Sequence, residues 1–167
     1  ILGRDANSCE AYQPATGLDE DQVTSIQRYL DAIRSNLLFA KSVMLVEGDA
    51  EEVMIPALVK RVLGLSVDEL GISVINIRST GFKNVAVLFH NIRIRKRCAI
   101  VTDLGTLFFD ATPNDEDTKA VAARKLRAIG SEEDGATRKM ALDDFADGNP
   151  WVAPFYATHT FEVDFAL

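Results

Sequence analysis

The feature that most constrains the fold is a run of four consecutive apolar residues, 43–46, which ends in Glu47 and Gly48. An uninterrupted apolar run of strand length is typical of a strand that is buried on both faces, as in a parallel sheet. Parallel strands need crossover connections, usually helices, so the segments that follow should alternate between helix and strand.

The next segments show that alternation. Residues 49–63 have acids at the start and a glycine at the end, as helices do, although Pro56 predicts a kink or a second start. Residues 72–77 and 98–102 are rich in β-branched and apolar residues and predict two more strands, with a helix at 82–91 between them. The order predicts an α/β fold with a parallel sheet and right-handed crossovers.

Three further regions complete the predicted architecture. Residues 1–18 read as a loop or arm, and the helix at 19–37 is indicated by one apolar stripe: Val23, Ile26, Leu30, Ile33 and Leu37. Residues 105–149 are charged and poor in large apolar side chains, which predicts two helices, at about 115–128 and 132–146, inserted outside the sheet. Residues 151–157 return to strand-like composition. We expect an arm and helix at 1–41 and one α/β domain at 42–167.

Composition excludes several classes of protein. No apolar run approaches the roughly 20 residues that a membrane-spanning helix needs. The two cysteines, Cys9 and Cys98, have no partner at metal-ligand spacing, which favours reduced thiols in a cytoplasmic protein. The net charge of −7 argues against a passive nucleic-acid-binding surface. An enzyme whose carboxylates bind metal ions and act on nucleic acid remains compatible with that charge.

Acidic residues gather at one predicted edge of the sheet. Glu47 ends the first strand, Asp103 ends the third and Glu162 follows the last, while Glu51 lies one helical turn beyond Glu47. Ligands of open parallel sheets bind at the carboxyl ends of the strands. Converging carboxylates suit a hard cation such as Mg²⁺, and two such ions can hold both oxygens of a phosphodiester displacement. Taken one by one, however, these acids also fit helix caps and solvated side chains.

A family resemblance adds to this pattern. Residues 43–51 read Val-Met-Leu-Val-Glu-Gly-Asp-Ala-Glu, and residues 100–103 read Ile-Val-Thr-Asp. Together they resemble a Toprim domain, a module of topoisomerases, primases and nucleases. Residues 37–58 and 70–76 resemble more narrowly the OLD (overcoming lysogenization defect) family, whose members join an ABC-type ATPase to a C-terminal Toprim nuclease. The resemblance covers residues 19–103 and resumes at 156–165.

The resemblance implies roles for five residues. Glu47 and Glu51 would help to hold one metal ion, Asp103 and Glu162 a second, and Thr160 would assist in a Ser-x-Glu-like element. The implied ions are Mg²⁺ or Mn²⁺, with Ca²⁺ as a substitute in crystals. The implied partners are DNA, the ATPase domain of the same full-length protein and further copies of that protein. The implied biological role is defence against phage.

The sequence departs from the family pattern at one position. The third strand of the family carries Asp-x-Asp, whereas this chain reads Asp103-Leu-Gly105. Loss of one ligand carboxylate predicts a weakened metal site. We also expect the chain to be a piece of a longer protein, because it begins with Ile1 rather than Met and ends directly after an apolar stretch. The sequence has no glycine-rich phosphate-binding loop, so we do not expect this piece to bind ATP.

Two weaker features lie nearby. The basic cluster Arg93, Arg95, Lys96 and Arg97 fits a solvated loop by default and a phosphate-backbone contact as the alternative. Arg78 and Lys83 could approach the acidic edge, and His159 could touch the site because it precedes Thr160.

The sequence therefore predicts a metal-dependent DNA endonuclease or nickase that uses two metal ions. The first alternative is a degenerate Toprim domain with a binding or regulatory role only, which Gly105 favours. The second alternative is an unrelated Mg²⁺-dependent phosphotransferase with the same edge geometry.

Overall fold

The computed structural model describes residues 2–5, 8–30, 34–78 and 81–166. Its centre is a four-stranded sheet, in the order β4 (Ile72–Asn76), β3 (Ser42–Val46), β5 (Arg97–Asp103) and β6 (Val152–Ala157). All three pairings are parallel. The predicted α/β class is confirmed, and so is the prediction that the first three strands are parallel neighbours.

The register aligns the carboxyl ends of the strands. Val46 pairs with Asn76 on one side and with Val101 on the other, and Asp103 pairs with Ala157. The residues that follow β3, β5 and β6 therefore leave the sheet at the same edge, as the sequence predicts for Glu47 and Asp103.

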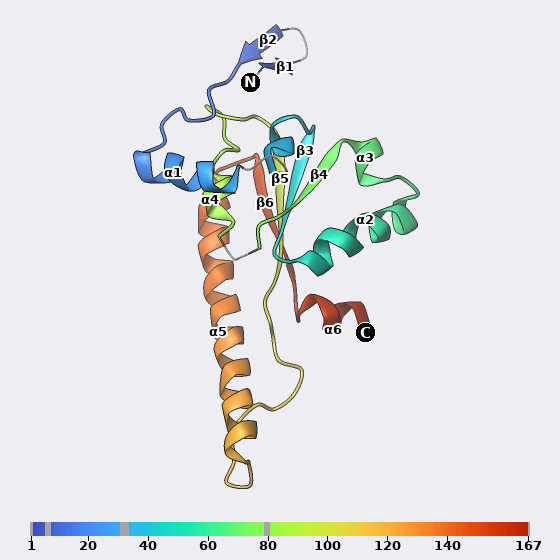
Figure 1. Ribbon diagram of the computed structural model, residues 1–167, viewed down its shortest axis with the longest axis vertical. Coiled ribbons are helices and arrows are strands. Elements are labelled where there is room, and N and C mark those ends of the chain that lie inside the picture. Colours follow the sequence, from blue (N-terminus) through green and yellow to red (C-terminus); the bar gives the residue numbers. More distant parts are fainter. Residues whose placement is uncertain (1, 6–7, 31–33, 79–80, 167) are drawn as a thin grey trace.

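Helices cover both faces of the sheet (Figure 1). α1 (Glu20–Tyr29), α4 (Lys83–Ala86) and α5 (Lys119–Ala146) lie on one side, while α2 (Asp49–Leu63) and α3 (Val67–Leu70) lie on the other. The buried core joins the sheet to the first side: Ile26, Leu37, Leu45, Phe82, Phe89, Ile100 and Leu142 all belong to it. α2 buries less, and its Val53 and Val62 are exposed.

The local sequence explains how α2 starts and stops. Gly48 is the N-cap, three acids occupy the first turn, and Gly64 ends the helix in the left-handed region at φ 73°. Acids near the N-terminus and a left-handed C-terminal glycine are both favourable there. Pro56 lies inside this single helix, so the predicted second start is wrong.

The N-terminal predictions need two corrections. Residues 1–18 include an antiparallel hairpin of β1 (Leu2–Asp5) and β2 (Ser8–Ala11), where the sequence predicted only a loop. The predicted helix at 19–37 ends at Tyr29, and a 3₁₀ turn, η1 (Arg34–Leu38), follows. Leu30 is the C-cap, with a ψ of 69° that no longer continues the helix. The predicted stripe residue Ile33 lies outside the described residues.

The later helices also differ from the prediction. The helix expected at 82–91 is the single turn α4, after which the chain folds back through a bridge between Phe89 and Ile94. The two helices expected at 115–128 and 132–146 are one helix, α5, of 28 residues. A short helix, α6 (Phe161–Ala166), follows β6.

α5 and the loop before it form the most extended part of the molecule. Residues 104–118 leave the carboxyl end of β5, run beyond the sheet and return as α5 (Figure 1). Leu107 donates its backbone N–H to Glu132, which ties the outgoing loop to the helix. This segment lies outside the sheet, as predicted. Across the described residues, no helix is both long enough and apolar enough to cross a lipid bilayer.

Candidate metal and nucleic-acid site

Glu47 and Asp103 lie close together at the carboxyl edge of the central strands. Nη2 of Arg138, on α5, is 3.9 Å from Oε2 of Glu47 and 3.7 Å from Oδ1 of Asp103. Both carboxylates therefore border one nitrogen atom. The two carboxylates are therefore well within roughly 12 Å of each other, the limit for sharing a site with two ions about 4 Å apart.

Thr102 fixes the position of Glu47. Its hydroxyl donates a hydrogen bond of 2.7 Å to Oε2 of Glu47, and Thr102 itself is buried, with 2% of its surface exposed. A neighbouring strand thus orients the carboxylate. A β-branched residue at the end of a strand gives no sequence signal of such a role, so Thr102 could not have been singled out beforehand.

Glu51 is the most buried of the four candidate acids. It is buried at 8% exposure in the first turn of α2, and its Oε2 faces Gly48, where a Cβ would be 3.0 Å away. Within the described part of the chain, the Glu51 carboxylate has no hydrogen-bond donor and no cationic partner. Among the described residues, the single buried side-chain polar atom without a partner belongs to Arg138, so the Glu51 carboxylate keeps contact with solvent and with any cation that enters from there.

Electrostatic coupling links the predicted acids. Burial raises the pKa of Asp103 above its ordinary value, and the negative charges of Glu47, Glu51 and Glu162 raise it further. The Arg138 guanidinium opposes this shift and lowers the pKa. The other three carboxylates that the sequence analysis selected therefore all act on Asp103 at the sheet edge.

Arg138 was not foreseen from the sequence. Besides its two ion pairs, Nη2 donates a hydrogen bond of 2.7 Å to the Asp103 carbonyl, and Nε is buried without a partner among the described atoms. The residue lies 35 positions beyond Asp103 in a charged helix. Only the packing of α5 against the end of β5 brings it to the acids.

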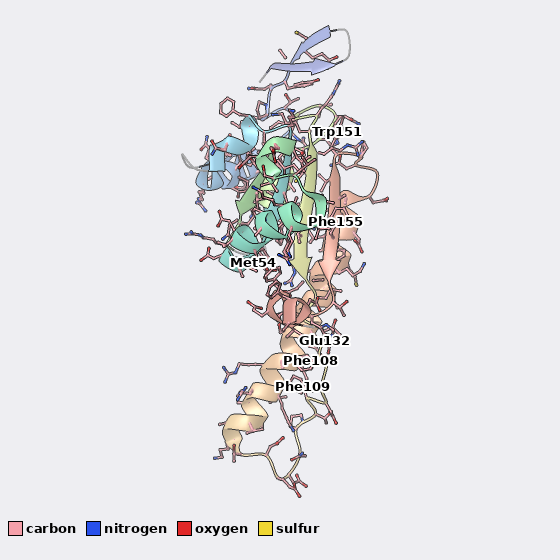
Figure 2. All side chains as sticks on the ribbon, turned by 90° about the vertical axis from the view of Figure 1, so that its right-hand side faces the viewer. Met54, Phe108, Phe109, Glu132, Trp151 and Phe155 are labelled. Atoms are coloured by element: carbon pink, nitrogen blue, oxygen red, sulfur yellow. The ribbon has the colours of Figure 1, made fainter. Side chains whose placement is uncertain are left out.

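The C-terminal candidates lie at the margin of the site. α6 lies beside the start of α2 in both views, which brings Glu162 into range of Asp103 (Figures 1 and 2). Thr160 is exposed, and its carbonyl accepts the first backbone hydrogen bonds of α6. His159 pairs with Asp164 at 2.7 Å. Of these residues, Glu162 alone couples to the central acids.

The donor set fits a hard divalent cation. All the candidate ligands are carboxylates, and Mg²⁺ commonly takes one or two carboxylates and completes its shell with water. Among the described residues, no group of three or more acidic, histidine or cysteine side chains is close enough to hold one ion together. Glu47 and Asp103, with Glu51 beside them, would therefore hold an ion through few direct contacts.

Gly105 occupies the place of the second Asp in Asp-x-Asp. Its φ is +61°, and a Cβ there would lie 3.3 Å from Oγ of Ser131 on α5. An aspartate in this left-handed conformation costs about 1 kcal/mol in backbone energy. Restoring the missing carboxylate would thus strain the loop and press on α5.

The side chains of the basic cluster, Arg93, Arg95, Lys96 and Arg97, form hydrogen bonds with the backbone of neighbouring segments. Each of its four side chains donates to a backbone carbonyl: Arg93 to Val87 and Thr16, Arg95 to Asn91, Lys96 to Leu38, and Arg97 to Pro150. The cluster surrounds the start of β5, about 20 Å from Asp103 at a strand rise of about 3.3 Å per residue. Arg93 is buried and structural, whereas Arg95 and Arg97 are exposed, as the solvated-loop interpretation expects.

The other two basic residues that the sequence analysis named, Arg78 and Lys83, lie in different surroundings. Nε of Arg78 lies 3.7 Å from Asp49, in the first turn of α2, and thus approaches the acidic edge. Lys83 instead lies over the ring of Phe145, 5.8 Å from its centroid. Only Arg78 is placed as the sequence suggested.

Comparison with known proteins identifies the central segment. Residues 38–104 match the family model of the overcoming lysogenization defect protein-like Toprim domain. Residues 38–104 therefore form an OLD-like Toprim domain. Glu47, Glu51 and Asp103 lie within this Toprim domain, whereas Arg138, Thr160 and Glu162 lie beyond the matched residues. No curated protein matches the chain.

Two solved structures resemble the Toprim domain and its surroundings. The C-terminal region of the Xanthomonas campestris pv. campestris OLD protein is 23% identical, with 76% of this chain and 54% of that chain covered and a TM-score of 0.45. The C-terminal region of the Burkholderia pseudomallei OLD protein is 28% identical, with 74% and 56% covered and a TM-score of 0.44. The chain spans about half the length of both.

The raised pKa of Asp103 predicts a pH dependence of stability. A carboxyl whose pKa is higher in the folded state stabilises the fold at low pH, and that contribution is lost as pH rises through the folded-state pKa. In EDTA at neutral pH, Asp103→Asn should therefore melt at a higher temperature than the wild type. The difference should shrink toward about pH 4, near the ordinary aspartate pKa of about 3.9. Thermal melts across this range test it, and a lower melting temperature of the variant at neutral pH would contradict the assigned repulsion.

Proposed function

We propose that this chain is a metal-dependent DNA endonuclease or nickase domain. The observation that carries the proposal is the meeting of Glu47 and Asp103 around Arg138, with Glu51 electrostatically coupled to Asp103, at one edge of an OLD-like Toprim domain. Carboxylates at the carboxyl ends of parallel strands suit Mg²⁺ or Mn²⁺ bound to a phosphodiester. The metal, when bound, would supply an activated water and stabilise charge on the leaving oxygen.

The residues of the chain divide the remaining work. Glu47, held by Thr102, would be the most rigid ligand, and Asp103 and Glu51 would complete the set from the neighbouring strand and helix. Glu162 and Thr160 would approach from α6. Arg138 balances part of the negative charge and can meet a phosphate oxygen once a metal ion takes over one of its carboxylate partners.

The wider setting is part of the same proposal. Toprim domains of the OLD family suggest a longer protein with an ATPase domain, self-association and a cytoplasmic role in phage defence. Within this chain we assign residues 1–41 to an arm and helix and 42–167 to the nuclease domain, with residues 105–149 as an insertion.

Two observations favour a second candidate, a Toprim domain that binds without cutting. Gly105 removes a carboxylate, and the Arg138 guanidinium already offsets part of the charge of Glu47 and Asp103. Both features weaken the case for a second metal ion.

Supercoiled-plasmid nicking separates the two candidates. The nuclease proposal predicts open circles with Mg²⁺ or Mn²⁺ and none in EDTA, since the metal supplies the nucleophile. Plasmid that stays supercoiled with either ion, while gel shifts still show bound DNA, would support the binding-only candidate instead.

A further inference from the structure

The extended segment carries a pocket that the proposed nuclease site does not use. We call residues 104–128 the projecting arm: the loop after β5 and the first turns of α5. The pocket has a volume of about 400 Å³. Apolar side chains of Phe109, Val121 and Ala128 line it, together with three cations: Arg124, Lys125 and Arg127.

The first turns of α5 differ in charge from the chain as a whole. Residues 119–128 contain four basic residues and no acidic one, in a protein of net charge −7. The loop contributes four acids, which bring the net charge of residues 104–128 to zero. Asp117 pairs with Lys125 at 2.8 Å, Asp110 accepts the backbone N–H of Thr112, and Asp115 and Glu116 lie in the turn at the tip. No acidic side chain lines the pocket.

The two arginines are available to a ligand. Both are exposed and stand three residues apart, on one face of α5. Among the described residues, the Arg124 guanidinium has no hydrogen bond or ion pair, and Arg127 uses only Nε, toward the Ala123 carbonyl. Two guanidinium groups beside an apolar floor suit phosphate groups attached to something flat and apolar.

An aromatic row connects the pocket to the acidic edge. Phe109 packs edge-to-face on Phe108, with centroids 5.3 Å apart, and Phe108 on His159, at 6.0 Å. Phe108 and Phe109 are 66% and 50% exposed, and they lie along the arm just below α6 (Figure 2). His159 lies three residues before Glu162, so the row ends at the margin of the candidate nuclease site.

We propose that the projecting arm binds single-stranded DNA, with Arg124 and Arg127 on its phosphates and Phe108 and Phe109 stacked against unpaired bases. The inference rests on the proposed function and extends it to the substrate: a DNA with an unpaired stretch beside the cut. Exposed aromatics with neighbouring cations are the usual means of holding single strands. Duplex DNA would engage the arginines only and leave the apolar floor unused.

The test measures binding without cutting. Fluorescence anisotropy in EDTA compares a labelled single strand of about 16 nucleotides with its duplex. The charge-reversed variant Arg124→Glu/Arg127→Glu should weaken single-strand binding and lower the slope of log K against log salt by about 1.4, the value for two lost phosphate contacts. Phe109→Ala should weaken single-strand binding about tenfold and leave duplex binding unchanged.

A matched control carries the same change of charge elsewhere. Lys60→Glu/Arg61→Glu alters two exposed cations in the last turn of α2, on the other side of the sheet, and should bind like the wild type. Equal affinity of the arm variant and this control would overturn the inference, as would equal losses of single-strand and duplex binding in Phe109→Ala. Sedimentation tests whether a second copy of this chain covers the arm instead of DNA. If the wild type is a dimer and the arm variants are monomers, the inference is also overturned.

The two proposals fail in different ways. A wild-type protein that nicks plasmid while its arm variants bind single strands normally refutes the arm alone. A protein whose arm binds single strands in EDTA but that never nicks with Mg²⁺ or Mn²⁺ refutes the nuclease assignment alone.

Discussion

Gly135→Ala is expected to destabilise the protein by about 2 kcal/mol, although alanine is the better helix former. Gly135 lies in α5 where the helix crosses the end of β5, and a Cβ there would stand 1.9 Å from the Leu104 carbonyl oxygen. Backbone cannot yield cheaply, so the helix must move outward. That movement would also separate Arg138 from the Asp103 carbonyl and reduce nicking.

Gly130→Ala is the matched control in the same helix. No atom outside the local helix backbone lies within 4 Å of a Cβ at this position. The substitution should stabilise the protein by about 0.5–1 kcal/mol through helix propensity alone. Urea unfolding of both variants measures the two effects. If Gly135→Ala proves as stable as Gly130→Ala, α5 does not cross β5 as closely as the approach to Leu104 requires.

Glu47→Gln is expected to reduce metal-dependent nicking by at least about 100-fold, since even the loss of an outer-shell group costs about 10- to 100-fold. Glutamine keeps an oxygen for the Thr102 hydroxyl, so the buried hydrogen bond survives and the charge alone is lost. Glu133→Gln, on the exposed side of α5, serves as the control and should nick normally. Gel densitometry over time gives both rates, and undiminished nicking by Glu47→Gln would remove Glu47 from the site.

Much of the sheet edge could be predicted because its signals are local. The apolar run at 43–46 and the β-branched residues at 72–76 mark buried strands, and parallel pairing then forces Glu47 and Asp103 to one edge. The first turn of α2 follows from its acids. These predictions need no knowledge of distant contacts.

The features that could not be predicted depend on tertiary contacts. The sequence predicts a break between 128 and 132, yet α5 continues through it, and Gly135 lets the helix pack closely on Leu104. Arg138 carries no motif, and only that packing delivers it to the acids. The sequence predicts a solvated loop for the basic cluster at 93–97 and gives no sign that its side chains donate to backbone carbonyls of distant segments.

Calorimetric titration with Mn²⁺ tests most directly whether the sheet edge is a metal site. We predict a binding isotherm for the wild type, an equal one for Glu133→Gln, and affinity at least about tenfold weaker in Glu47→Gln, because one of few carboxylate ligands is gone. The titration requires no DNA and no catalytic turnover. Equal Mn²⁺ affinity in Glu47→Gln and the wild type would contradict the metal-site proposal and leave these acids with a structural role.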